Sequence, residues 1–401
     1  MLPETAALAG VRIIEFATLV AGPIAGSYLA QLGADVIKVE PIGGDPSRSL
    51  VAPTAPDRVA PPYLANNVGK RSVTIDLKQA AGIEAARRLV ASADVVIENF
   101  RPGALDQLGL IAEEALRSNP GLTWISIRGY GPEGGWRARP AVDGIIQADS
   151  GMVEITGHPD GPGVKAGFPV VDHAAGHVIV STALAALLRR ARGTQMGPEQ
   201  RHHVVALFDV ALSMQATGFT DYLVSGVLPR RLGNASQLSA PNQSLRTSDG
   251  SVMMAAYLPH HWVALCDVLG CPELTGDPRF RDRLDRMANR QALEAELEQR
   301  TTTFTAEELF RLLDGAGLMA GVVRDYEEVA TCEQVVANDL LVDVRSSDGR
   351  TYRALRSPLR GFDAEDAAHF IDRTGEHTDE ILRDVGLDDA EISTLHRAGA
   401  V

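Results

Sequence analysis

A strand–helix–strand pattern over residues 11–40 sets the expected fold of this chain. Val11 to Phe16 is a short apolar run, and Asp35 to Glu40 is a second short run rich in valine and isoleucine. Between them, a turn containing Ala21-Gly-Pro leads into a helical segment that ends near Leu32. Two strands joined by a helix form the repeating unit of α/β proteins. The pattern therefore predicts an α/β fold with a parallel sheet.

Further strands are expected along the first half of the chain, at 71–77, 94–98, 122–127 and 201–206, with helices at 79–91, 112–117 and 208–223. Two loops, 99–103 and the glycine-rich 129–135, follow strands at their carboxyl ends. Open α/β sheets bind ligands at this edge. Side chains on these two loops are therefore candidates for ligand contact.

The composition changes near Ser225, where a polar segment rich in Asn, Ser and Pro begins. A strand at 251–257 and helices at 261–269, 289–300 and 305–316 follow, which together predict a smaller α+β domain. Asp348-Gly349 is expected to form the turn of a hairpin over 343–352. The tail, 376–400, is expected to form two short helices.

Net charge is −14, which disfavours nucleic acid or an anionic membrane as the main partner. The three cysteines lack CxxC spacing, and the N-terminus has no signal-peptide pattern, so we expect a reduced, cytoplasmic protein. The longest apolar run, Val178 to Leu188, is too short by itself to span a bilayer.

Several common catalytic motifs are missing from the sequence. The first turn lacks G-x-G-x-x-G, so Glu40 is either the ribose-binding acid of a nicotinamide site or, as we prefer, a structural residue at a strand end. No G-x-S-x-G, H-E-x-x-H or P-loop motif is present. His173 and His177 are one helical turn apart, which suits either a metal or two buried structural histidines.

Asp172 is the most informative single carboxylate. The apolar run Phe168 to Val171 ends on it, and a helical segment, 173–190, follows directly. We therefore expect Asp172 at the N-cap of a buried helix. The helix N–H groups there would keep the carboxylate ionised and could also stabilise an oxyanion. The alternative is that Asp172 only caps the helix.

Basic residues near expected strand ends are the candidates for phosphate contacts. They are Lys70, Arg71, Lys78, Arg101 and Arg128. A second basic group, formed by Arg189, Arg190, Arg192 and Arg201, is more typical of a solvated face or a subunit contact.

An ordered set of short motifs resembles one enzyme family along the whole chain. The motifs are Leu8-Ala-Gly-Val-Arg-Ile-Ile-Glu-Phe, Ala21-Gly-Pro, Leu32-Gly-Ala-Asp-Val-Ile-Lys-Val-Glu40, Lys70-Arg-Ser, Glu98-Asn-Phe-Arg-Pro-Gly103, Val171-Asp172 and Gly375-Glu-His-Thr-Asp-Glu-Ile-Leu382. In this order they resemble the family III CoA-transferases, which include formyl-CoA:oxalate CoA-transferase.

The resemblance implies an open, Rossmann-like large domain built from both chain ends, 1–224 and 331–401, and a smaller α+β domain at 225–330. It also implies an interlocked homodimer. The implied activity moves CoA from an acyl-CoA thioester to a small carboxylic acid, with CoA as substrate and product and no cofactor or metal. Asp172 matches the nucleophile that forms the covalent aspartyl intermediate. Residues matching the CoA pocket are Ala21, Ile75, Lys78, Asn99 and Phe100.

The chain departs from the oxalate enzyme at several positions. Thr18 and Val20 replace polar residues near the substrate, while Pro41, Gln107 and Pro140 replace basic CoA contacts. Arg48, Arg101 and Arg139 are expected to take over the phosphates. The covering glycine-run loop is replaced by 234–242, so oxalate is not the expected acceptor.

A racemase branch of the same family, acting on 2-methylacyl-CoA, is the alternative activity. That branch carries a histidine just before an aspartate in the segment matching Ala141-Val-Asp-Gly144, where this chain has Val142. Racemisation needs two groups that exchange a proton with Cα. Because one group is missing, we expect the transferase.

Overall fold

A computed structural model describes residues 6–50, 60–359 and 369–401. The chain divides into two compact units. The first contains 1–152, 166–225 and 337–401, and the second contains 153–165 and 226–336. The structure thus groups 153–165 and 331–336 with the second unit, whereas the sequence placed both segments in the large domain.

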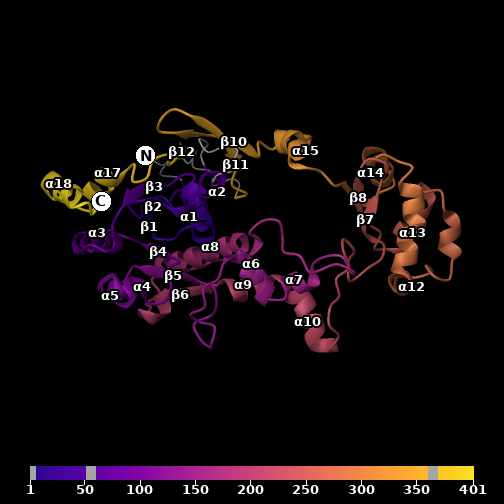
Figure 1. The fold of residues 1–401 in the computed structure, drawn as a ribbon, viewed down its shortest axis with the longest axis horizontal. Helices are drawn as coiled ribbons and strands as arrows, with labels where there is room; N and C mark the ends of the chain where they lie inside the picture. The colour runs from indigo at the N-terminus through magenta and orange to yellow at the C-terminus, as the bar shows by residue number, and fades with distance from the viewer. Residues whose placement is uncertain (1–5, 51–59, 360–368) are drawn as a thin grey trace. The chain divides into compact units, whose positions relative to one another are not determined.

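The first unit is built on a six-stranded sheet with the order β3-β2-β1-β4-β5-β6 (Figure 1). The strands are β1 (Arg12–Glu15), β2 (Asp35–Glu40), β3 (Arg71–Thr74), β4 (Val95–Glu98), β5 (Thr123–Arg128) and β6 (His202–Ala206). Every neighbouring pair is parallel, as the sequence predicted. The strand order reverses between β1 and β4. In open α/β sheets the carboxyl ends of the strands at such a reversal form the ligand-binding crevice, so we call this part of the sheet edge the crevice between β1 and β4.

Helices cover both faces of this sheet. Strand side chains alternate, so that Ile13 faces one apolar layer and Ile14 the other. The first layer contains α1 (Ala21–Gln31), α8 (Val170–Ala191) and α9 (Leu207–Met214). The second contains α3 (Ala80–Ala91), α5 (Ala112–Ser118) and the C-terminal helices α17 (Thr378–Asp384) and α18 (Asp389–Ala398). Both ends of the chain therefore build one core.

Shorter elements complete the first unit. They are η1 (Pro46–Ser49), α2 (Pro61–Asn66), α4 (Ala104–Gln107), α6 (Asp143–Asp149), η2 (Glu199–Arg201), α10 (Ala216–Ser225) and a small sheet of β10 (Leu341–Ser346), β11 (Thr351–Leu355) and β12 (His369–Phe370). The hairpin β10–β11 turns at Asp348-Gly349, where Gly349 has φ of 86°. This confirms the predicted hairpin. The single helix expected over 208–223 is instead two helices, α9 and α10.

The second unit packs helices against a small antiparallel sheet. Its strands, in the order β7-β8-β9, are β7 (Asn242–Arg246), β8 (Ser251–Ala255) and β9 (Met319–Val322). Its helices are α11 (Pro259–Val268), η3 (Pro272–Gly276), α12 (Arg283–Ala288), α13 (Arg290–Thr301), α14 (Ala306–Gly315) and α15 (Tyr326–Thr331). The short helices α7 (Met152–Ile155) and α16 (Glu333–Ala337) lie where the chain passes between the units.

Helix α8 is longer than the apolar run that predicted it. It has 22 residues, and its most apolar window has a mean hydropathy of 1.5, so by length and composition alone it could cross a membrane. The run Val178 to Leu188 is therefore part of a helix of sufficient length, contrary to the prediction from the run alone. Core helices of soluble proteins pass the same test, and Ala175, Ile179 and Ala183 of α8 are fully buried in the first apolar layer.

The contact between α1 and α8 depends on a glycine. A Cβ atom on Gly176 would lie 2.3 Å from Cγ2 of Ile24 and 3.4 Å from the carbonyl oxygen of Ala21. The first turn of α1 therefore packs directly against the backbone of α8, one helical turn beyond Asp172.

We expect Gly176→Ala to lower the free energy of unfolding by about 1–3 kcal/mol, because the added methyl group overpacks this contact. The matched control is Gly218→Ala in α10, where a Cβ atom meets nothing within 4 Å. That change should stabilise by up to about 1 kcal/mol through helix propensity. Urea unfolding of both variants measures the difference, and equal stabilities would show that the α1–α8 contact is loosely packed.

Candidate active site

Asn99 joins the two loops that border the crevice between β1 and β4. Its Oδ1 accepts a hydrogen bond from the backbone N of Thr18 at 3.1 Å, and its Nδ2 donates to the carbonyl oxygen of Thr18 at 2.8 Å. Thr18 lies in the turn between β1 and α1, and Asn99 directly follows β4. A residue expected to contact a ligand thus also fixes the backbone of the neighbouring loop.

Phe100 and Arg101 line a cavity of about 190 Å³ at the same edge of the sheet. Glu98 and Arg128 form one part of its wall, and they are paired at 2.7 Å. His202 lies beside them, with its Nε2 2.9 Å from Oγ of Ser126. The cavity therefore has an aromatic ring, an exposed guanidinium and a neutralised ion pair around it.

The other residues predicted to bind CoA follow the strand ends. Ala21 is the first residue of α1, after β1. Ile75 follows β3, and its side chain is only 1% exposed, so only its backbone could meet a ligand. Lys78 is exposed three residues further on. Arg139 lies over Trp136 and Tyr130 and pairs with Asp149 at 3.1 Å, so it is already engaged.

Asp172 is not an N-cap residue, contrary to the sequence prediction. Helix α8 begins at Val170 with Pro169 as its N-cap, which places Asp172 in the first turn. The backbone N–H groups of Val171 and Asp172 both donate to Oδ2 of Asp143, at 2.8 and 3.1 Å. These groups are occupied, so they are not available to stabilise an oxyanion as the sequence suggested.

Asp143 lies beside Asp172 in the candidate site, although the sequence did not indicate it. It is the first residue of α6, its exposed fraction is 8%, and its Oδ1 accepts from the side-chain amide of Gln147. Gln147 is itself buried and accepts a hydrogen bond from the backbone N of Ala166 at 2.9 Å. Asp143 directly follows Val142 in the segment that was compared with the racemases. The neighbouring residues gave no sign that it caps helix α8, whose Val171 is 28 residues away.

Burial and the charge of Asp143 raise the pKa of Asp172 to about 7. The expectation that the helix terminus keeps Asp172 ionised is therefore wrong, because desolvation and a like charge outweigh the helix dipole. A folded pKa above the ordinary value of 3.8 means that the folded chain binds more protons. The contribution of the Asp172 carboxyl group to the free energy of unfolding is thus lost as pH rises from about 4 to about 7.

The two histidines of α8 have aromatic neighbours. The ring of His177 stacks on Tyr28 with centroids 5.1 Å apart, and His173 meets the edge of Phe168 at 6.2 Å. Burial and the neighbouring His177 lower the pKa of His173. Within residues 6–50, 60–359 and 369–401, no three His, Cys, Asp or Glu side chains form a group that could hold a metal.

Several basic residues proposed for phosphates are bound to carboxylates instead. Lys70 pairs with Glu15, Arg71 with Asp35, Arg128 with Glu98 and Arg48 with Glu40, at 2.7–2.8 Å. Besides its pair with Arg48, Glu40 accepts hydrogen bonds from the hydroxyl groups of Tyr63 and Ser72. Glu40 is therefore a structural residue, as the sequence favoured. Of the basic residues named at strand ends, Lys78 and Arg101 remain exposed.

Comparisons with known proteins identify the family of the chain. Residues 8–377 match the profile of CoA-transferase family III. The chain is 36% identical to the probable fatty acyl-CoA transferase Rv3272 of Mycobacterium tuberculosis, covering 88% of this chain and 91% of the relative. It is 37% identical to succinate–glutarate CoA-transferase of Agrobacterium fabrum, covering 88% of each. A CAIB/BAIF family protein from Brucella suis has a similar structure, with a TM-score of 0.82 at 36% identity over 94% of this chain and 98% of that one.

We expect Asp143→Asn to lower the pKa of Asp172 towards the ordinary range. The amide oxygen can still accept the two backbone hydrogen bonds, but the neighbouring negative charge is gone. NMR of ¹³Cγ-labelled aspartate follows the titration, and the Asp172→Asn spectrum assigns the signal. Asp149→Asn, on the same helix, is the matched control and should leave the pKa unchanged. An unshifted pKa in Asp143→Asn would mean that burial alone perturbs Asp172.

Proposed function

The chain belongs to CoA-transferase family III, and we propose that it transfers CoA from an acyl-CoA to a small free carboxylic acid through a covalent intermediate on Asp172. One observation carries the proposal for Asp172. At the position that the resemblance assigns to the nucleophile, the chain has a desolvated carboxylate whose pKa is raised to about 7. Because basicity and nucleophilicity rise together, such a carboxylate attacks better than an exposed one.

The proposed reaction has two halves, one for the donor acyl-CoA and one for the acceptor acid, and each half consists of two nucleophilic attacks. An oxygen of Asp172 attacks the thioester carbonyl, the carbon–sulfur bond breaks, and CoA leaves as a thiolate, which gives a mixed anhydride. The thiolate then attacks the aspartyl carbonyl, releasing the first acid as carboxylate and leaving an aspartyl-CoA thioester. The acceptor carboxylate reverses these steps. The thioester is never hydrolysed, so the chemistry needs neither ATP nor a metal.

The surroundings of Asp172 fix its backbone, but they leave the oxyanion donors to be supplied from elsewhere. Each step passes through a tetrahedral oxyanion, which hydrogen-bond donors must stabilise. Since Asp143 occupies the amides of Val171 and Asp172, those donors come from outside the first turn of α8. Asp143 instead fixes the backbone that carries the nucleophile, which favours a near-attack geometry.

CoA is proposed to lie along the carboxyl edge of the sheet. Ala21, Asn99 and Phe100 stand at the crevice between β1 and β4, where open sheets bind ligands. Lys78 and Arg101 are exposed cations that suit phosphate groups. The small side chain of Ala21 lets a ligand approach the first turn of α1. Arg139 would have to break its ion pair with Asp149 to reach CoA, so we propose that it contributes less to CoA binding than Lys78 and Arg101.

A racemase is the second candidate function. Val142, at the racemase histidine position, is 60% exposed and cannot exchange a proton. The neighbouring Asp143 is buried and occupied by backbone amides. These observations favour the transferase over the racemase.

The test is a matrix of acyl-CoA donors and free acids, read by mass spectrometry for CoA exchange. The acids named for the succinate–glutarate relative are the first acceptors to try. We expect exchange by the wild type and a loss of several orders of magnitude in Asp172→Asn, as for other covalent nucleophiles. Borohydride or hydroxylamine trapping should map to the peptide containing Asp172. Deuterium exchange at Cα, at a rate comparable with CoA exchange, would favour the racemase instead.

We further propose that the protein is a homodimer. Helix α10 carries Phe219, Tyr222, Leu223 and Val224, has no buried residue, and exposes Val224 to 83%. An exposed apolar surface of this kind indicates an interface. We expect sedimentation at micromolar concentration to give twice the chain mass, and Val224→Glu to weaken the dimer because it places a charge there. A stable wild-type monomer would contradict the proposal.

A further inference from the structure

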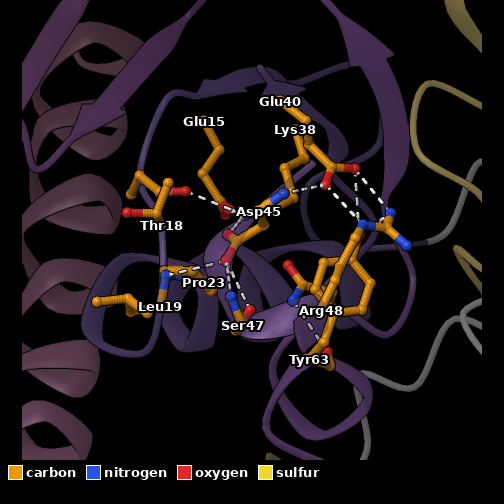
Figure 2. Close-up of polar contacts among 12 residues, drawn as sticks. Glu15, Thr18, Leu19, Pro23, Lys38, Glu40, Asp45, Ser47, Arg48 and Tyr63 are labelled. Atoms are coloured by element: carbon orange, nitrogen blue, oxygen red, sulfur yellow. Dashed lines mark hydrogen bonds and ion pairs between the residues drawn. The ribbon is translucent and has the colours of Figure 1, made fainter. Parts of the chain in front are cut away.

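Four charged side chains lie buried together near the turn between β1 and α1, and Figure 2 labels three of them, Glu15, Lys38 and Asp45. They are Glu15, Lys38, Asp45 and Lys70, and none is more than 2% exposed. Two are anions and two are cations, so the group, which we call the ion cluster, is formally neutral. None of the four takes part in the proposed chemistry.

The contacts within the ion cluster form a chain of alternating charge. Lys38 Nζ lies 2.8 Å from Oδ2 of Asp45 and 3.1 Å from Oε1 of Glu15. Lys70 Nζ lies 2.8 Å from Oε2 of Glu15 and donates to Oδ1 of Asn67 at 2.9 Å. Helix α1 leaves room for this arrangement at Gly26, where a Cβ atom would lie 1.9 Å from Oε2 of Glu15.

Stability alone does not explain the ion cluster. Each buried ion loses hydration worth several kcal/mol, and apolar side chains of similar volume often replace buried ion pairs without loss of stability. The core on the same face of the sheet is rich in such side chains, for example Ile13, Val36 and Leu29. A role in fixing a particular backbone conformation is the better explanation.

The ion cluster bonds to the backbone on both sides of the turn. Lys38 donates to the carbonyl oxygen of Ala17 at 2.9 Å, and Lys70 donates to that of Pro23 at 2.8 Å. Oδ1 of Asp45 accepts from the backbone N of Leu19 at 3.5 Å. Asp45 is held in turn by Ser47, whose backbone N and Oγ donate to the same oxygen at 2.8 and 2.6 Å.

The turn held in this way is strained. Leu19 has φ of 69°, a left-handed conformation that costs a leucine about 1–2 kcal/mol. In Figure 2, its side chain extends away from the charged groups, and it is 36% exposed. Strained residues persist only where their surroundings hold them, and they concentrate at functional sites. Thr18, the residue before it, is the one that Asn99 bonds across the crevice.

We propose that Glu15, Lys38, Asp45 and Lys70 are positioning residues, which hold the turn Ala17–Val20 in its strained conformation so that it can seat the acyl-CoA at the crevice between β1 and β4. This inference rests on the proposed function for its ligand. The four residues act through the turn and do not touch the substrate. Their removal should therefore impair catalysis more than folding.

The test is the double variant Lys38→Met, Asp45→Asn, which stays neutral because Glu15 and Lys70 remain paired. The control is Asp35→Asn, Arg71→Met, which removes an ion pair from the opposite, amino-terminal edge of the same strands, β2 and β3. We expect kcat/KM for CoA exchange to fall roughly 10- to 100-fold in the first variant, since small displacements at a site cost this much. The control should keep wild-type kinetics at a similar melting temperature.

A second substitution separates positioning from a merely structural role. Glycine adopts positive φ without strain, so Leu19→Gly should restore part of the lost kcat/KM in the double variant. In the wild type the same change should give no gain, because the ion cluster already holds the turn. Hydrogen exchange of the peptide spanning 17–22 should be faster in the double variant and unchanged in the control.

These outcomes distinguish the inference from the proposed function. A wild type without CoA exchange would contradict the function, while the hydrogen exchange would still test whether the cluster holds the turn. An active wild type, with equal kinetics and exchange in the double variant and the control, would overturn the inference. If the double variant does not fold, Asp45→Asn alone, which keeps the shape of the side chain, is compared with Asp35→Asn by the same measurements.

Discussion

The close packing of α1 against α8 connects the two halves of the candidate site. Gly176 allows Ile24 and the carbonyl oxygen of Ala21 to approach the backbone of α8. Asp172 lies one turn before this glycine, and the strained turn at Leu19 lies just before Ala21. A displacement of either helix would therefore move Asp172 relative to the turn at Leu19.

Buried charge is used in two different ways around this contact. In the ion cluster, two anions and two cations are paired with one another, and the two lysines also bond to backbone carbonyl groups at the turn. Asp143 and Asp172 are both carboxylates, and burial together with the charge of Asp143 raises the pKa of Asp172. Paired buried charges of opposite sign suit the positioning role that we propose for the ion cluster, whereas neighbouring charges of the same sign perturb a pKa.

The sequence predicted the parallel sheet from the strand–helix–strand pattern over residues 11–40, which depends only on neighbouring residues. Asn99 could be placed at the crevice because it directly follows a strand. Asp143 could not be recognised, since its partners lie 28 and 29 residues away. The same separation in sequence explains why Asp172 was wrongly predicted to be the N-cap of α8. A side chain brought in by tertiary packing caps α8, so Val170 and Val171, which resemble a strand, form the first helical turn.

The ion cluster was hidden for a related reason. Lys70 was interpreted as a phosphate contact because it stands just before a strand, but its direction is decided by Glu15, 55 residues earlier. Lys38 and Glu15 are single charges within apolar strands, where a local pattern indicates only an edge or a solvent-facing position. Such local conflicts with the expected pattern are concentrated where a protein gives up stability for function. Charged residues inside otherwise apolar central strands are therefore better indicators of this site than the exposed basic residues near it.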